Sequence, residues 1–209
     1  MGNPVAATKL FDLREVDELV LFDVSARLEL NSPDFSQIER ISSVNFVPLT
    51  VGGGVRGVED ARVLFRDCGA DKVAVGHALG RQTDIIQAVA RDFGCQSVVA
   101  VLKHDGSIPD TLESARACVD SGAGELIVQS RGRDGTQSGY DIEVIGAVLG
   151  AVSVPVVAAS GCGSFADMDA VLSVGADAVA AGALWQFTKS TPLEAKRYLE
   201  EKGGPVRIP

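Results

Sequence analysis

The chain has 209 residues, of which 46% are hydrophobic and 22% charged, a balance typical of a folded globular protein. Its 28 acidic and 19 basic residues give a formal net charge of −9, which argues against non-specific binding to nucleic acid. No apolar run reaches the roughly 18 residues of a membrane span, and residues 1–4 show no signal-peptide pattern. The four cysteines lack the paired spacing of zinc sites. We therefore expect one cytoplasmic domain over residues 1–209, without metal or cofactor.

Short apolar runs alternate with amphipathic segments from one end of the chain to the other. Helices are predicted over 4–15, 34–43, 57–68, 81–93, 110–121, 140–151, 164–174 and 191–202. Strands are predicted over 18–24, 46–51, 72–76, 97–102, 125–130, 154–159 and 178–182. Continuous runs rich in Val, Leu and Ala are typical of parallel strands that are buried on both faces. The regular alternation indicates a parallel α/β fold.

An internal repeat narrows the architecture. Residues 50–79 match residues 158–184, with Gly53 aligned to Gly161 at an offset of 108 and Asp71 to Asp177 at an offset of 106. Each half is thus a β-α-β-α unit, and two such halves favour a (β/α)8 TIM barrel over a doubly wound sheet. Only seven strands are recognised, so the barrel is expected to lack its first strand.

Glycine-rich segments follow several predicted strands, at the barrel end where active-site loops lie. Their glycines let backbone N–H groups approach an anion closely, so they predict phosphate binding. Tight turns are the alternative interpretation. The candidate phosphate-binding residues in these segments are Gly53, Gly54, Asp134, Gly135, Thr136, Gly161, Gly182 and Ala183.

Candidate acids and bases are few. Asp23 lies late in the first predicted strand and is either a site residue or a structural cap. Asp134 is a general base, a ligand of a hydroxyl group or part of a turn. No Ser/His/Asp or Cys/His arrangement predicts a nucleophile.

Charged residues open three alternate strands at the opposite end of the predicted barrel. Glu18, Lys72 and Glu125 would converge in one inward layer, where mixed charges are costly unless they pair. They are interpreted either as solvated strand ends or as a gate for a small polar molecule.

The motifs resemble the cyclase subunit of imidazole glycerol phosphate synthase, the HisF family. The similar segments are 48–54, 69–73, 122–125, 133–136, 139–141 and 175–178. The resemblance implies a barrel that takes ammonia from a glutaminase subunit docked at its bottom face and cyclises a phosphorylated ribonucleotide. It also implies that Glu18, Lys72 and Glu125 form the ammonia gate, that Asp23 and Thr50 line the active-site mouth, and that the glycine loops hold two phosphate groups. By the same resemblance, Gly76 and His77 stand where the family has phosphate ligands and are further candidate phosphate-binding residues.

Both catalytic aspartates of that family lack a counterpart. One lies on the missing first strand, and Leu102 stands at the other position. Leucine cannot transfer a proton, so the sequence argues against ordinary cyclase turnover by this chain alone. A wrong start site is one explanation of the missing strand. The edges at 18–24 and 178–182 would be unpaired, which predicts self-association.

Two alternative functions remain open at this point. Residues 3–54 also resemble paralogues of the family that relay ammonia during bacterial surface-sugar amidation. The other alternative is a non-catalytic barrel that keeps its phosphate loops and docks a glutaminase.

Overall fold

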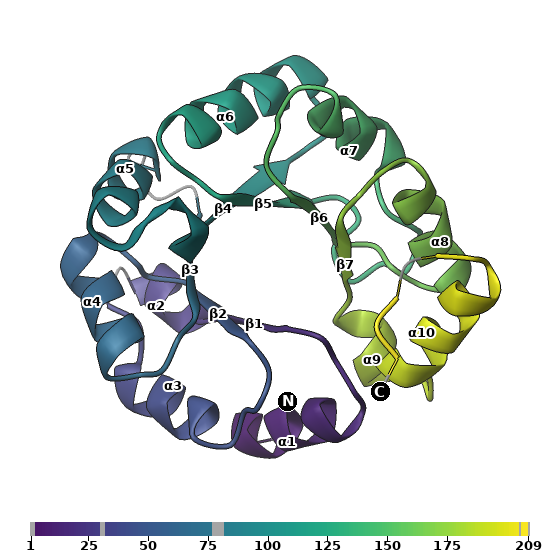
Figure 1. The fold of residues 1–209 in the computed structure, drawn as a ribbon, viewed down its shortest axis with the longest axis horizontal. Coiled ribbons are helices and arrows are strands. Elements are labelled where there is room, and N and C mark those ends of the chain that lie inside the picture. Colours follow the sequence, from purple (N-terminus) through teal and green to yellow (C-terminus); the bar gives the residue numbers. More distant parts are fainter. Residues whose placement is uncertain (1–2, 30–31, 77–81, 205, 209) are drawn as a thin grey trace. The chain divides into compact units, whose positions relative to one another are not determined.

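The computed structural model describes residues 3–29, 32–76, 82–204 and 206–208. Its strands are β1 (Leu19–Phe22), β2 (Leu49–Gly52), β3 (Lys72–Val75), β4 (Val98–His104), β5 (Glu125–Ser130), β6 (Val156–Ala159) and β7 (Ala178–Ala180). Its helices are α1 (Pro4–Leu13), α2 (Val24–Glu29), α3 (Phe35–Ser42), α4 (Val58–Arg66), α5 (Gln82–Phe93), α6 (Ile108–Asp120), α7 (Ile142–Leu149), α8 (Phe165–Ser173), α9 (Ala183–Phe187) and α10 (Pro192–Glu201), with a 3-10 turn η1 (Cys95–Ser97). All seven predicted strands and eight predicted helices are confirmed, and Figure 1 labels them in place.

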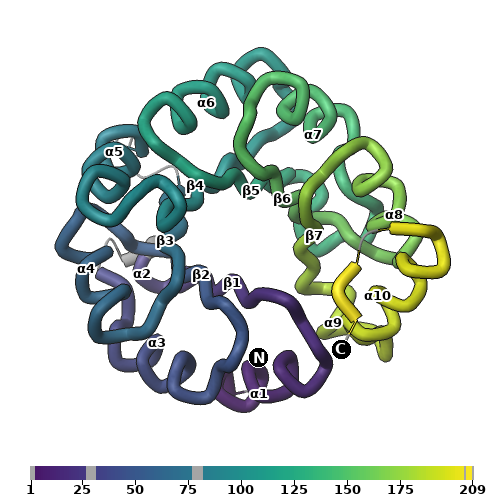
Figure 2. Tube along the Cα trace, viewed as in Figure 1, coloured from purple at the N-terminus to yellow at the C-terminus, as the bar shows by residue number. Residues whose placement is uncertain are grey.

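The strands follow the chain order β1-β2-β3-β4-β5-β6-β7 in one sheet, and the described pairs are parallel. Parallel neighbours that are also consecutive in sequence require a crossover between them, and helices supply it in each interval. The α/β fold of the TIM-barrel class is therefore confirmed. The trace in Figure 2 can be followed through the same succession of strand and helix.

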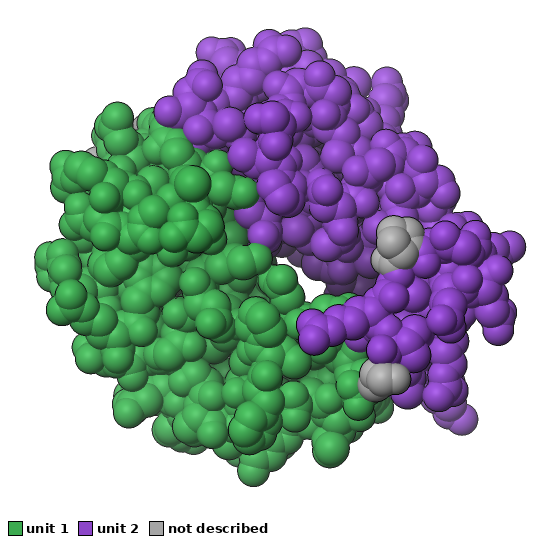
Figure 3. Space-filling model, in the orientation of Figure 1, with its two compact units in different colours: residues 1–100, 121–124 green, residues 101–120, 125–209 purple. Residues whose placement is uncertain are grey.

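The chain forms two compact units (Figure 3). Unit 1 comprises residues 1–100 and 121–124, and unit 2 comprises residues 101–120 and 125–209. In unit 1, Val51 and Val73 are fully buried, and in unit 2 Leu126, Val128 and Val156 are as well. Each unit thus has its own apolar core along its strands, because short Val- and Leu-rich strands are covered on both faces.

The two units repeat the same hydrogen bonds, which confirms the repeat read from the sequence. In unit 1, the Asp71 carboxylate accepts from the Leu49 N–H at 2.7 Å while the Asp71 N–H donates to the Leu49 carbonyl at 2.8 Å. In unit 2, Asp177 and Val156 make the same two bonds, at 2.8 and 3.0 Å. Each aspartate joins the start of one strand to the turn before the next.

Three of the predicted helices begin at side-chain caps. Asp34 caps α3 through the Gln37 N–H, and Ser164 forms a capping box with Asp167 at the start of α8. Thr191 does the same for α10, where Pro192 occupies the first helical position. These caps fix where each helix begins and therefore how long each loop after a strand is. No helix within the described ranges is long and apolar enough to span a bilayer.

Candidate functional site

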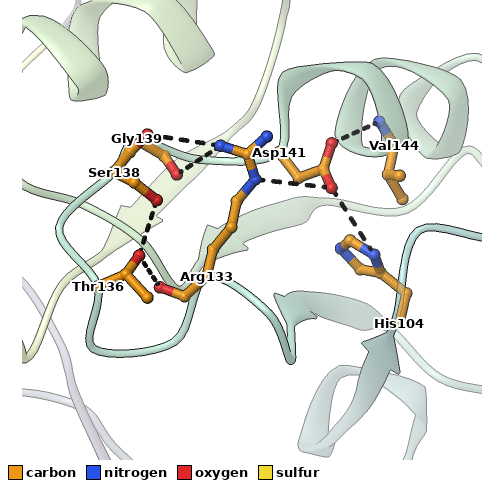
Figure 4. A network of polar contacts seen from close by, with 7 residues as sticks. All are labelled: His104, Arg133, Thr136, Ser138, Gly139, Asp141 and Val144. Atoms are coloured by element: carbon orange, nitrogen blue, oxygen red, sulfur yellow. Dashed lines mark hydrogen bonds and ion pairs between the residues drawn. The ribbon is translucent and has the colours of Figure 1, made fainter.

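The loop between β5 and α7 is closed on itself by hydrogen bonds, as Figure 4 shows. The Arg133 carbonyl accepts from the Thr136 N–H at 3.1 Å and from the Thr136 hydroxyl at 2.8 Å. The Arg133 guanidinium donates to the carbonyls of Ser138 and Gly139, both at 3.4 Å. Asp134 and Gly135 lie between these two closures, so their backbone has one defined course.

This loop packs backbone to backbone against the loop that follows β6. The Gly139 N–H donates to the Gly161 carbonyl at 2.7 Å, and the Ser160 hydroxyl donates to the Asp134 carboxylate at 3.2 Å. A methyl group on Gly161 would overlap the Gly139 carbonyl, and one on Gly163 would overlap the Gln137 carbonyl. The glycines predicted after β6 are thus required by close approach of a neighbouring loop. Asp134, Gly135, Thr136 and Gly161 therefore lie on two loops of unit 2 that are hydrogen-bonded to each other.

Tyr140 ties the end of the same loop to β7. Its ring is 3% exposed, and its hydroxyl donates to the Ala180 carbonyl at 3.1 Å. Burial raises the pKa of Tyr140, and neighbouring Cys162 and Asp167 raise it further. The phenol therefore stays protonated and remains a hydrogen-bond donor. Burial likewise raises the pKa of Cys162, so this thiol is not a reactive thiolate.

Several amide groups of these loops have no acceptor among the described residues, namely those of Asp134, Gly135, Gly161 and Cys162. By contrast, the N–H groups of Gly163 and Ser164 both donate to the Asp167 carboxylate, at 2.9 and 2.8 Å. Unused backbone N–H groups are donors of the kind with which proteins bind anions. Asp134 can take part only through its N–H, since its carboxylate would repel a phosphate.

The remaining predicted phosphate-binding residues lie at the end of β3, at the start of α9 or outside the described residues. Gly76 follows β3 in unit 1, and Gly182 precedes α9 in unit 2, followed by Ala183. A methyl group would meet nothing within 4 Å at either glycine, so neighbouring atoms do not require glycine there. His77 lies outside the described residues.

In unit 1, the Asp23 carboxylate is fully used as a cap. One oxygen accepts from the Ser25 N–H and hydroxyl and the Ala26 N–H, at 3.0, 2.6 and 3.1 Å, and the other accepts from the Asp34 N–H at 2.9 Å. Burial opposes ionisation, but these bonds outweigh it and lower the pKa of Asp23. The geometry supports the capping interpretation of Asp23 over the catalytic one.

The other residues predicted near the mouth are buried within strands or closely packed. Thr50 is 2% exposed in β2 and Leu102 is 4% exposed in β4. A methyl group on Gly53 would overlap the Asp23 carbonyl, so glycine is required by the close approach of the segment after β1, just as Gly161 is required by the approach of the β5 loop. The adjoining Gly54 also has a positive φ, of 73°. Within the described ranges, no group of three His, Cys, Asp or Glu side chains is placed to hold a metal ion.

At the opposite ends of the strands, the predicted gate residues Lys72 and Glu18 form an ion pair. The Lys72 ammonium at the start of β3 lies 3.1 Å from the Glu18 carboxylate, which precedes β1. Their side chains are 22% and 47% exposed, so the pair is partly desolvated. Glu125 opens β5 in unit 2 and is half-buried. Pairing answers the objection that unpaired charges at this end would be costly.

Sequence reasoning missed a group of polar residues beside the β5 loop. Arg133 and Asp141 form an ion pair at 3.8 Å, and the His104 imidazole lies 4.0 Å from the same Asp141 oxygen (Figure 4). Arg133 and Asp141 lie in segments 133–136 and 139–141, which resemble the family, but the sequence predicted no role for either residue. Nothing in the local sequence around His104 signals its contact, because it comes from a different strand.

Comparisons with known proteins give a concordant result. A family model described as "Histidine biosynthesis protein" matches residues 1–190. The imidazole glycerol phosphate synthase subunit HisF of Chloroherpeton thalassium (strain ATCC 35110 / GB-78) is 37% identical to the chain. That alignment covers 99% of the chain and 88% of the relative.

Proposed function

The chain belongs to the histidine biosynthesis protein family, in its HisF-like cyclase branch, and on this basis we propose that it binds a phosphorylated small molecule and receives ammonia from a glutaminase subunit. The observation that carries the proposal is the pair of interlocked loops after β5 and β6, where Gly139 and Gly161 join. A cytoplasmic location, inferred from the sequence, is part of the same proposal.

Phosphate binding is supported by the donors that the loops leave over. The amides of Gly135, Gly161 and Cys162 have no acceptor within the described residues, while the loop around them is held by other bonds. Preorganised backbone donors bind a phosphate without the cost of ordering a flexible segment. A chain with a net charge of −9 needs such local donors to hold an anionic ligand.

A glutaminase is proposed to dock at the strand ends that carry the Lys72–Glu18 pair. Two large apolar side chains are exposed on chain segments that lead into the strands there. Phe46, shortly before β2, is 84% exposed, and Leu13, at the end of α1 before β1, is 79% exposed. Exposed aromatic side chains are frequent anchors of protein interfaces. The Lys72–Glu18 pair is the proposed entrance for ammonia.

Turnover by the family's own cyclase reaction is not part of the proposal. Leu102 has no proton to transfer, and the Asp23 carboxylate is engaged by four donors. We therefore favour an ammonia-receiving, phosphate-binding role, which fits both the paralogue that serves sugar amidation and the scaffold alternative. Asp134 is the one exposed carboxylate at the β5–β6 loops that is left for proton transfer.

The glutaminase proposal is tested by exchanging one exposed phenylalanine at a time. Phe46→Asp should weaken binding of a glutaminase subunit about thirtyfold, since loss of an interface aromatic typically costs about 2 kcal/mol. Phe187→Asp on α9, where the ring is 77% exposed, is the matched control and should bind as the unchanged chain does. Calorimetric titration measures both. Equal binding by the two variants, or no binding by the unchanged chain, would contradict the proposal.

Self-association is a further part of the proposal, because β1 and β7 stand at the two ends of the strand order. Sedimentation velocity should show a species larger than the 21.8 kDa chain at micromolar concentration. A single monomeric boundary would rule it out.

A further inference from the structure

Asp141 holds three neighbours at once. One carboxylate oxygen accepts from the Val144 N–H at 3.5 Å and so caps α7. The other oxygen lies 3.8 Å from Arg133 Nε and 4.0 Å from His104 Nδ1 (Figure 4). A cap alone needs only the first oxygen, and an uncharged side chain provides it equally well. The second oxygen, with its charge, therefore calls for an explanation of its own.

That second oxygen orients the side chain that closes the loop. Arg133 reaches Asp141 through Nε and the carbonyls of Ser138 and Gly139 through Nη1. A guanidinium is planar and rigid, so fixing Nε also fixes the direction of Nη1. The course of the loop past Gly135 therefore depends on the carboxylate of Asp141.

His104 is not a charged partner of Asp141, so the cation that Asp141 binds here is Arg133. Its side chain is 2% exposed, and neither ring nitrogen has a hydrogen-bond partner among the described residues. Burial lowers the pKa of His104, opposed by Asp141 and Asp105 and reinforced by Arg133. The imidazole is thus neutral near pH 7. It lies next to the Asp141 carboxylate as an uncharged ring and does not compete with Arg133 for it.

We propose that Asp141 is a positioning residue, which acts through Arg133 to hold the amides of Asp134 and Gly135 in the conformation that binds a phosphate group. The inference rests on the proposed function in so far as it assigns phosphate to this loop. The conformational part stands on the contacts of Arg133 alone and can be measured without any ligand.

A role in positioning has a different signature from a role in stability. The Arg133 and Asp141 side chains are 40% and 18% exposed, and ion pairs of that exposure add little to the free energy of unfolding. Asp141→Asn keeps the helix cap and removes the charge. It should leave the midpoint of thermal unfolding nearly unchanged while loosening the loop.

Asp34→Asn is the matched control. Like Asp141, Asp34 is the N-cap residue of its helix, α3, through the Gln37 N–H at 3.0 Å, but among the described residues it forms no ion pair with an arginine. Arg133→Gln is a second variant that retains Asp141 and its cap. If Asp141 acts through Arg133, the Arg133→Gln variant should behave like Asp141→Asn.

Two measurements on full-length chains decide the matter. Amide hydrogen exchange of Gly139, whose N–H donates to Gly161, should be about fivefold faster in Asp141→Asn and Arg133→Gln and unchanged in Asp34→Asn. Inorganic phosphate, followed by the NMR shifts of the Gly135 and Gly161 amides, should bind about fivefold more weakly to the first two variants.

The outcomes separate this inference from the proposed function. An unchanged rate of Gly139 amide exchange in Asp141→Asn would overturn the inference, whatever the result of the phosphate titration. Faster exchange together with no phosphate shift in the unchanged chain would support the positioning of the loop and remove the phosphate assignment from both proposals. Equal effects of Asp34→Asn and Asp141→Asn would reduce Asp141 to a cap and also overturn it.

Discussion

Gly161→Ala is expected to destabilise the chain by about 2–5 kcal/mol. Gly161 has a φ of 91°, where an L side chain costs about 1–2 kcal/mol. Its added methyl group would also overlap the Gly139 carbonyl, which is a backbone group and cannot turn aside as a flexible side chain could. Forcing the two loops apart costs about 1–3 kcal/mol more. Chemical denaturation measures the loss, and the Gly139-to-Gly161 hydrogen bond should be lost with it.

Gly135→Ala separates the cost of the positive φ from the cost of the steric overlap. Gly135 has a φ of 73°, but nothing lies within 4 Å of an added methyl group, so only the cost of the backbone conformation remains. Gly53→Ala, the repeat partner in unit 1, has both a φ of 95° and an overlap with the Asp23 carbonyl. It should resemble Gly161→Ala. If Gly135→Ala cost as much as these two, close approach of the loops would not be the reason for the glycines.

The elements of the fold were predictable because each long strand or helix carries its own signal. Apolar runs of Val and Leu give the strands, and Asp34, Ser164 and Thr191 mark helix starts. The missed helices are short: α2 (Val24–Glu29) and α9 (Ala183–Phe187) cover too few residues for a helical period to be recognised. Their positions depend on contacts such as the Asp23 cap, which only the fold reveals.

The site was predictable to the level of its loops and no further. Glycines after strands predicted that an anion approaches the backbone closely, whereas the atoms that require glycine at position 161 belong to a neighbouring loop. The sequence left Asp23 open between a catalytic and a capping role, because both need a carboxylate at a strand end. The choice depends on the Asp34 N–H, eleven residues away in the chain. Likewise, the approach of His104 to Asp141 joins residues from separate segments.

Leu102→Asp, which places a carboxylate where the sequence interpretation expects a catalytic aspartate of the family, is expected to destabilise the chain strongly. Leu102 is 4% exposed in β4, and losing its side chain costs about 2–5 kcal/mol. Burial disfavours the charged carboxylate, so the pKa of the new Asp would rise in the folded state. The folded chain would then bind a proton that the unfolded chain releases above pH 4 or so. Stability should therefore fall as pH increases from about 4 to 8.

Leu102→Asn has nearly the same shape without a titrating group, and its loss of stability should not vary with pH in this range. The difference between the two variants is about 1.4 kcal/mol at pH 8 for each unit by which the folded pKa of the aspartate is raised. Urea unfolding at pH 5 and pH 8 measures it. A flat difference would mean that the new carboxylate reaches water, as a carboxylate in an open active-site mouth does. In that case ammonia-dependent cyclase turnover by Leu102→Asp becomes the informative assay. With the steep difference expected here, the strand is packed shut around position 102, and one substitution cannot restore the reaction because the surrounding core has no room for a charged base.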